Sequence, residues 1–280
     1  MCRLILIETS TSLCSTALAE NGKIICSRRS SEPRAHASLT AVFVKEMMDE
    51  AGWSAPDAVA VSMGPGSYTG LRVGVSTAKG LCFGWKVPLI AISTLDILAR
   101  QAIEAGLPDG CAGILPMVDA RRMEVYTAPY SPTGQRLGDI APVVLDPDSF
   151  SDLFASGPIV VIGDAAEKFR MLKGATGASP WRACPPPDRG RGRGPSNGAP
   201  GNLGLLGCSQ MGGAVVSEAN EVPPEAGLPC ADGYVQACPE AAAMLVPAMQ
   251  KYAKKEFEDI AYFEPFYLKQ FIATTPKKLF

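Results

Sequence analysis

The sequence of 280 residues contains a single histidine, His36. A zinc site with two histidine ligands, or an HxxxH metal site, needs at least two histidines, so this chain alone can build neither. A catalytic pair of serine or cysteine with histidine has to use His36 for the same reason. The histidine count therefore excludes most metal-dependent hydrolases and leaves one narrow route to nucleophilic catalysis.

Paired cysteines, long apolar runs and an excess of one charge are also missing. The nine cysteines are odd in number and include no CxxC pair, which argues against both a disulfide framework and a zinc ribbon. No stretch approaches the roughly 20 apolar residues of a membrane span, and the opening apolar run is too short for a signal peptide. The net charge of −2 excludes nucleic-acid binding by bulk charge, although a local basic patch stays open. We expect a cytoplasmic protein without membrane association.

The apolar segments that are present alternate between strand-like and helix-like patterns, which indicates an α/β fold. Three short strands with an Asn21-Gly22 hairpin turn open the chain. A helix with one apolar face follows from Ser38 to Ala51, where Gly52 ends it. Further strands are expected over residues 57–63 and 87–92, and further helices over 70–83 and 94–105.

A second unit repeats the start of the first one. A strand over 114–118 ends at Asp119, just as the first strand ends at Glu8. The pattern predicts two duplicated domains, residues 1–105 and 106–280. Two such units facing each other would place Glu8 and Asp119 on opposite walls of one cleft, where two carboxylates could hold Mg²⁺ or a water molecule. An ion pair of Asp119 with Arg121 or Arg122 is the alternative.

Residues of about 174–237 differ in composition from the rest, because they are rich in glycine and proline and because Trp181 is the only aromatic residue from Gly174 to Gly233. Such a segment buries too little apolar surface to offset its ordering entropy, so we expect a largely disordered insertion. Its Arg-Gly repeat at 189–194 either contacts RNA phosphates or belongs to a linker, and the linker is favoured. Order is expected to resume with a helix over 239–252.

The segment from Gly64 to Gly70 is expected to form an elbow between a strand and a helix. It is not a phosphate-binding P-loop, because no Gly-Lys-Ser/Thr follows. It is not a nucleophile elbow either, since GxSxG centred on Ser67 would need glycine at positions 65 and 69. An anion site at the helix N-terminus and a tight turn remain, and the tight turn is favoured.

Small residues form two rows on the helix that follows. Gly70, Gly74 and Ala78 make one row, and Ser76, Gly80 and Gly84 make the other. Because a glycine inside a helix costs roughly 1 kcal/mol relative to alanine, the rows predict close approach by another element, either within the chain or from a partner. The candidate interface comprises Leu39, Val42, Phe43, Met47, Gly70, Leu71, Gly74, Val75 and Ala78. The members on the first helix, Leu39, Val42, Phe43 and Met47, also fit as ordinary residues of the hydrophobic core.

The turn after the first strand occupies the place where actin-like kinases hold a nucleotide phosphate. It reads Glu8, Thr9, Ser10 and Thr11. Close approach of a phosphate favours glycine there, whereas Ser10 carries a side chain. These four residues are therefore candidates for a degenerate phosphate loop, and whether a nucleotide binds them stays open.

Five segments together resemble the bacterial TsaB family. The longest reads MGPGSYTGLRVG over residues 63–74, and the others lie at 5–11, 79–81, 118–126 and 264–268. The resemblance covers about 1–173 and 238–280. It implies an actin-like ATPase (ASKHA) fold built from two duplicated RNase H-like domains.

The resemblance also implies a role in making threonylcarbamoyladenosine beside the anticodon of tRNA. In that family a paralogous partner, TsaD, catalyses the transfer, and its HxxxH motif holds a metal. The ATPase TsaE joins the assembly, and tRNA is bound through the complex. This chain is then a non-catalytic subunit with no cofactor of its own; ATP and the metal are expected in partner subunits. The helices at 38–51 and 70–83 match the family's partner-binding pair, which could also form a homodimer.

Two departures from the family pattern and two rival functions stay open. Glu8 stands where aspartate is usual, and the insertion replaces a stretch of the second domain. The rivals are a small-molecule kinase of the same fold and a serine hydrolase or peptidase that uses Ser67 and His36.

Overall fold

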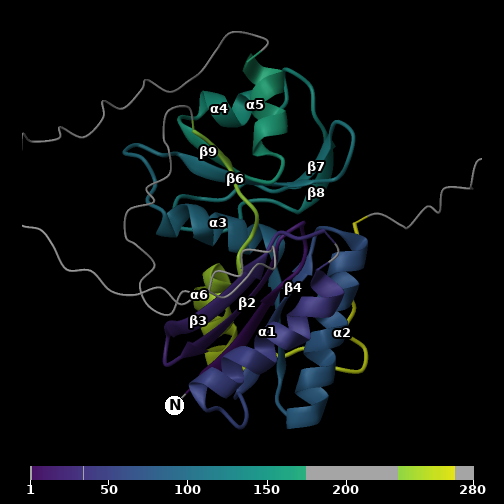
Figure 1. Ribbon diagram of the computed structural model, residues 1–280. Coiled ribbons are helices and arrows are strands. Elements are labelled where there is room, and N and C mark those ends of the chain that lie inside the picture. The colour runs from purple at the N-terminus through teal and green to yellow at the C-terminus, as the bar shows by residue number, and fades with distance from the viewer. Residues whose placement is uncertain (1, 34, 175–232, 269–280) are drawn as a thin grey trace, which may run out of the picture.

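The computed structural model describes residues 2–33, 35–174 and 233–268, which form two β-sheets with helices on their faces (Figure 1). The first sheet has the strand order β3-β2-β1-β4-β5. Its strands are β1 (Arg3–Glu8), β2 (Cys14–Glu20), β3 (Lys23–Ser30), β4 (Ala58–Gly64) and β5 (Leu89–Ser93). The first three strands form the antiparallel meander predicted from the hairpin signal, and β4 and β5 run parallel to β1.

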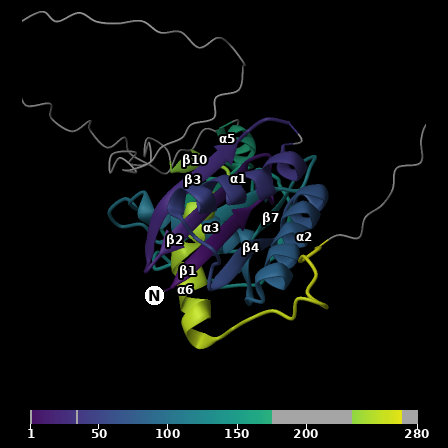
Figure 2. The same ribbon diagram turned by 60° about the horizontal axis from the view of Figure 1, so that its bottom comes forward.

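Alternating residues of β1 fill two separate cores, because successive side chains of a strand point to opposite faces. Ile5 and Ile7 pack under α1 (His36–Ala51) and α2 (Tyr68–Trp85). Leu4 and Leu6 pack on the other face, where the 3₁₀ helix η1 (Ala241–Met244) and α6 (Leu245–Lys254) lie. Figure 2 shows α6 on the side of the sheet opposite α1 and α2.

The second sheet repeats the topology of the first. Read from its antiparallel edge it has the order β8-β7-β6-β9-β10, with β6, β7 and β8 antiparallel and β9 and β10 parallel to β6. Its strands are β6 (Gly113–Asp119), β7 (Glu124–Thr127), β8 (Ala141–Val144), β9 (Ile159–Gly163) and β10 (Tyr234–Gln236). The predicted duplication is therefore confirmed.

Three further helices cover the faces of the second sheet. One face of its sheet packs on α3 (Thr94–Glu104), which lies between the two sheets in Figure 1. The other face carries α4 (Ser151–Ala155) and α5 (Ala166–Gly174), whose Phe169 is fully buried. Within the described residues no helix combines the length and the apolar character that crossing a membrane requires.

The structure differs from the predicted domain plan in two places. Residues 241–254 were assigned to the second domain by chain order, but η1 and α6 pack on the first sheet. The glycine- and proline-rich insertion was predicted to reach residue 237, whereas β10 already pairs with β9 from Tyr234 and completes the second sheet. The rest of that predicted insertion, residues 175–232, lies outside the described residues.

Candidate functional site

A cleft of about 890 Å³ lies where the two units meet. It is bounded by the turn after β1, the start of α1, the elbow before α2 and the carboxyl ends of β6 and β9. The residues that line it are Ser10, Thr11, Ser12, His36, Ala37, Pro65, Gly66, Ser67, Tyr68, Thr69, Gly70, Val73, Val118, Asp119, Ala120, Arg121, Tyr126, Asp164, Phe266, Tyr267 and Leu268. Ligands of α/β proteins bind in such clefts at the carboxyl ends of strands, so this is the principal candidate site.

Glu8 lies behind the turn after β1 and does not line the cleft. Its side chain is fully buried; Oε1 accepts hydrogen bonds from Ser10 N at 2.5 Å and from Ser62 Oγ at 3.0 Å. Burial raises the pKa of Glu8 to about 7, and the hydrogen bonds from Ser10 and Ser62 oppose that shift. The predicted pairing of Glu8 with Asp119 across the cleft is therefore wrong, because this carboxylate supports the turn from within.

The phosphate-loop candidates Thr9 and Ser10 are packed against the elbow and α2. A Cβ on Gly66 would lie 2.3 Å from Ser10 O, and one on Gly70 would lie 2.1 Å from Thr9 O. Hydrogen bonds join the same segments, from Ser67 N to Ser10 O at 2.6 Å and from Thr9 Oγ1 to Gly70 O at 2.9 Å. The elbow is thus the tight turn that the sequence favours, and its glycines serve the close contact between α2 and the turn after β1.

Ser67 and His36 both line the cleft, but they do not form the pair that a hydrolase needs. Ser67 Oγ accepts the hydrogen bond of Gly70 N at 3.3 Å and so caps the N-terminus of α2. Within the described residues no hydrogen bond joins Ser67 to His36, and His36 Nε2 is buried without a partner. The serine that the rival function requires has a structural role here.

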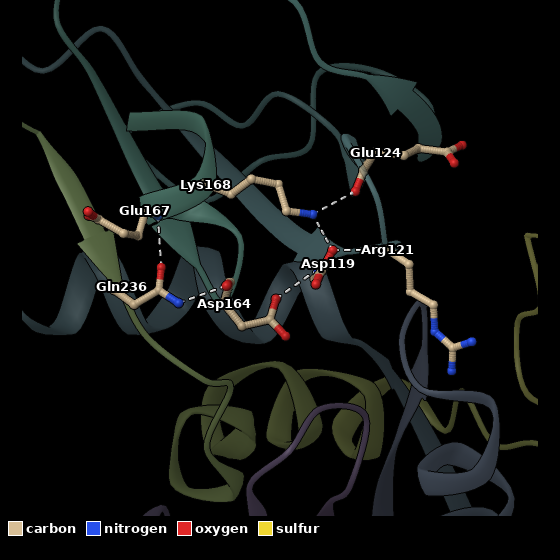
Figure 3. A network of polar contacts seen from close by, with 7 residues as sticks. All are labelled: Asp119, Arg121, Glu124, Asp164, Glu167, Lys168 and Gln236. Atoms are coloured by element: carbon tan, nitrogen blue, oxygen red, sulfur yellow. Dashed lines mark hydrogen bonds and ion pairs between the residues drawn. The ribbon is translucent and has the colours of Figure 1, made fainter. Parts of the chain in front are cut away.

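Asp119 is the centre of a polar network on the opposite wall (Figure 3). Lys168 Nζ forms an ion pair with Asp119 Oδ1 and donates a second hydrogen bond to Glu124 O at 3.3 Å. Arg121 contributes only its backbone N, which donates to Asp119 Oδ1 at 2.8 Å. The ion pair predicted with Arg121 or Arg122 is therefore formed by Lys168, which the sequence analysis did not single out.

Asp164, which sequence reasoning also missed, lies beside Asp119. Its Oδ1 accepts a hydrogen bond from Asp119 N at 2.8 Å. Burial raises the pKa of Asp164 to about 6, partly offset by that hydrogen bond. A signal was available, since Asp164 directly follows β9 as Asp119 ends β6. In the part of the chain that is described, no group of three or more His, Cys, Asp or Glu residues is placed to hold a metal.

Most of the predicted partner interface is buried inside the chain. The seven buried members are Phe43, Met47, Gly70, Leu71, Gly74, Val75 and Ala78. A Cβ on Gly74 would lie 2.1 Å from Thr9 Oγ1, so the row that contains it packs on the chain's own turn. For these seven residues the prediction of a direct contact surface is wrong, because small size here serves internal packing.

The second row of small residues has the opposite environment. Ser76, Gly80 and Gly84 are exposed, and a Cβ on either glycine would meet nothing within 4 Å. Phe83 lies on the same helix with 80% of its surface exposed. Of the residues predicted on α1, Val42 is 44% exposed and Leu39 is half-buried. This outer surface of α1 and α2 is what remains available to a partner.

Sequence comparisons point to one pathway. The family model described as "TsaD: tRNA N6-adenosine threonylcarbamoyltransferase" matches residues 25–166. The chain is 29% identical to the "tRNA threonylcarbamoyladenosine biosynthesis protein TsaB" of Escherichia coli strain K12 over 97% of this chain and 96% of that protein. It is 35% identical to the protein of the same name from Haemophilus influenzae over 44% of this chain, which spans only 51% of that relative.

The fold is similar to that of a solved structure described as "YeaZ from Pseudomonas aeruginosa". The two superpose with a TM-score of 0.62 at 23% sequence identity, and the match covers 96% of this chain and all of the other. A second structure from the same organism, described as an uncharacterized protein with similarity to peptidase YEAZ, gives a TM-score of 0.63 at 24% identity. At these identities the likeness establishes the fold alone.

Proposed function

The chain belongs to the TsaD family and within it to the TsaB proteins, and from this premise we propose that it takes part in making threonylcarbamoyladenosine in tRNA as a non-catalytic subunit. Its fold is the actin-like arrangement of two RNase H-like units. The proposed partner is the catalytic TsaD paralogue, with the TsaE ATPase and tRNA joining the complex. We place the assembly in the cytoplasm.

The observation that carries the proposal is the exposed surface of α1 and α2, which contact each other along the first sheet (Figure 1). An exposed glycine inside a helix costs roughly 1 kcal/mol, and among the described residues a Cβ on Gly80 or Gly84 would meet no neighbour within 4 Å that justifies this cost. Phe83 exposes an aromatic ring of the kind enriched at interfaces. A helix of another chain could approach closely over Gly80 and cover Phe83.

The internal hydrogen bonds of the turn after β1 support assigning the chemistry to the partner. A phosphate needs free backbone amides, whereas Ser10 N donates to Glu8 Oε1 and Thr9 N donates to Ser62 Oγ. Glu8 is buried under the turn. We therefore propose that ATP and the metal are bound by partner subunits and that this chain needs neither for its role.

Co-purification with the TsaD paralogue tests the interface. Gly80→Arg adds a long charged side chain where the chain itself leaves open space, so the fold should be retained while the partner helix is held away. Ala253→Arg on α6 is the matched control, because Ala253 is also an exposed small helical residue. We expect loss of the complex for Gly80→Arg alone.

Two results would contradict the proposal. Gly80→Arg could leave the complex and its transferase activity intact, which would show that this face is not the interface. Alternatively, the isolated chain could hydrolyse ATP or modify tRNA at a substantial rate, which would show that it is an enzyme by itself. Light scattering of the isolated chain tests in addition whether the same face forms a homodimer that Gly80→Arg dissociates.

A further inference from the structure

The turn between β6 and β7 carries two adjacent arginines in an unfavourable backbone conformation. Arg121 has φ 70° and Arg122 has φ 51°, both in the left-handed region that glycine and asparagine adopt most readily. Other residues pay roughly 1–2 kcal/mol each there. The turn is held from below, because Arg121 N donates to Asp119 Oδ1 and Ala120 N donates to Glu124 O at 3.1 Å. The turn thus carries two arginines at positions whose backbone conformation glycine or asparagine would adopt with less strain.

The charges of these arginines are not used within the described part of the chain. Both side chains are exposed, and no ion pair there joins either guanidinium to a carboxylate. Asp119, the nearest acidic residue in the network, is already paired with Lys168. Figure 3 shows the Arg121 side chain directed away from that pair, and Arg121 lines the cleft. The charge of Arg121 therefore remains for an anionic ligand in the cleft, and Arg122, which follows it in the turn without lining the cleft, adds a second exposed charge next to it.

Aromatic side chains line the same cleft as Arg121. Phe266 and Tyr267 are each 37% exposed, so both rings are accessible. Their segment is anchored, since Phe266 N donates to Met63 O at 2.7 Å and the Tyr267 ring lies 4.9 Å from that of Tyr68. Guanidinium groups and accessible aromatic rings are the combination with which proteins bind unpaired nucleotides, through phosphate contacts and base stacking.

We propose that the mouth of the cleft binds unpaired nucleotides of RNA, with Arg121 and Arg122 contacting phosphates and Phe266 and Tyr267 stacking on bases. The inference rests on the proposed function for the identity of the polymer as RNA. An unpaired segment fits better than a duplex because Arg121 and two aromatic rings line one cleft, whereas binding a duplex through its backbone takes a wide basic face.

The test measures RNA binding by the full-length chain with fluorescence anisotropy. The probes are a labelled, unmodified anticodon stem-loop and the same RNA annealed to its complement. The double substitution Arg121→Asn and Arg122→Gly removes both charges and also relieves the backbone, so a purely structural turn would gain stability. We expect at least a tenfold loss of stem-loop affinity without loss of thermal stability. The slope of log K against log salt should fall by roughly 1.4, since each phosphate contact to a single strand contributes about 0.7.

A matched double variant controls for net charge. Arg29→Asn with Arg100→Asn removes the same charge from residues that do not line the cleft and that pair with Glu240 and Glu104. It should bind the stem-loop within about twofold of wild type. An equal loss in both double variants, or tighter binding of the duplex than of the stem-loop, would overturn the proposal.

The reconstituted complex gives a second readout that separates this inference from the proposed function. The cleft variant should still co-purify with the TsaD paralogue, and its transferase reaction should show a raised KM for tRNA with kcat little changed. An unchanged KM for tRNA would overturn the proposal even if the isolated chain bound RNA too weakly to measure. The proposal would also be overturned if the cleft variant lost the complex but kept its affinity for the stem-loop, because the arginines would then contact an acidic protein surface.

Discussion

Replacing each of two glycines of α2 by alanine should change stability in opposite directions. Gly80 is exposed, and a Cβ there would meet nothing within 4 Å, so Gly80→Ala removes only the helix penalty of glycine. It should raise the free energy of unfolding by about 1 kcal/mol. Gly70→Ala would place a Cβ 2.1 Å from Thr9 O, and relieving that overlap should cost about 1–3 kcal/mol.

The assay is urea unfolding of the isolated chain followed by tryptophan fluorescence, with thermal unfolding as a check. A gain of 1 kcal/mol corresponds to a rise of about 2–4 °C in Tm for a chain of this size class. Stabilisation by Gly70→Ala would refute the packing of α2 on the turn after β1. Destabilisation by Gly80→Ala would show that Gly80 is held by contacts within the chain and does not belong to an open surface.

The same Gly80→Ala variant separates stability from assembly. If a partner helix lies close over Gly80, the added methyl group weakens the complex while it stabilises the free chain. A pull-down with the TsaD paralogue should therefore show reduced association for a protein that is more stable by itself. Stronger or equal association would place the partner elsewhere.

Three further outcomes are expected. The pKa of Glu8 is raised from 4.5 to about 7, so the folded state holds this proton more tightly than the unfolded state does. The free energy of unfolding should therefore fall by up to about 3 kcal/mol as the pH rises from 4.5 to about 7. Urea unfolding at each pH measures this decline, and Glu8→Gln should flatten it. Ser67→Ala removes the N-cap of α2 and should lower the free energy of unfolding by about 0.5–2 kcal/mol in the same assay, while the complex keeps its transferase activity. Loss of that activity at normal stability would instead support a catalytic role for Ser67. Phe83→Ser should leave Tm of the free chain within about 2 °C and weaken complex formation in a pull-down, because the ring is 80% exposed; an unaffected complex would exclude Phe83 from the interface.

The order of elements could be predicted from local patterns because both helix and strand signals are periodic. The Asn21-Gly22 turn, the apolar face of α1 and the alternation along β1 all lie within short windows of sequence. The duplication was visible for the same reason, since β1 and β6 end alike in an acidic residue. Patterns of this kind say nothing about which sheet a late segment joins, and so α6 was assigned to the wrong unit.

The candidate site was only partly predictable. Asp119 was identified from its place at the end of an apolar strand, with Arg121 or Arg122 as its expected ion-pair partner, but the partner is Lys168, which lies far away in sequence on α5. The burial of Glu8 could not be foreseen either, because a carboxylate at a strand end usually faces solvent or a ligand. Its environment depends on Ser62 and on α2, which only packing brings to it.

By itself the sequence determined that this chain has two matching α/β units, a specific family motif and a single histidine, which cannot form a site with two histidine ligands. Those properties follow from residue types and short-range spacing. Tertiary structure decided which of the two small-residue rows of α2 faces inward, since both rows consist of small residues at the same spacing of four. The rotation of a helix about its axis depends on what lies against it, and here the turn after β1 accepts Gly70 and Gly74 and leaves Gly80 and Gly84 to solvent.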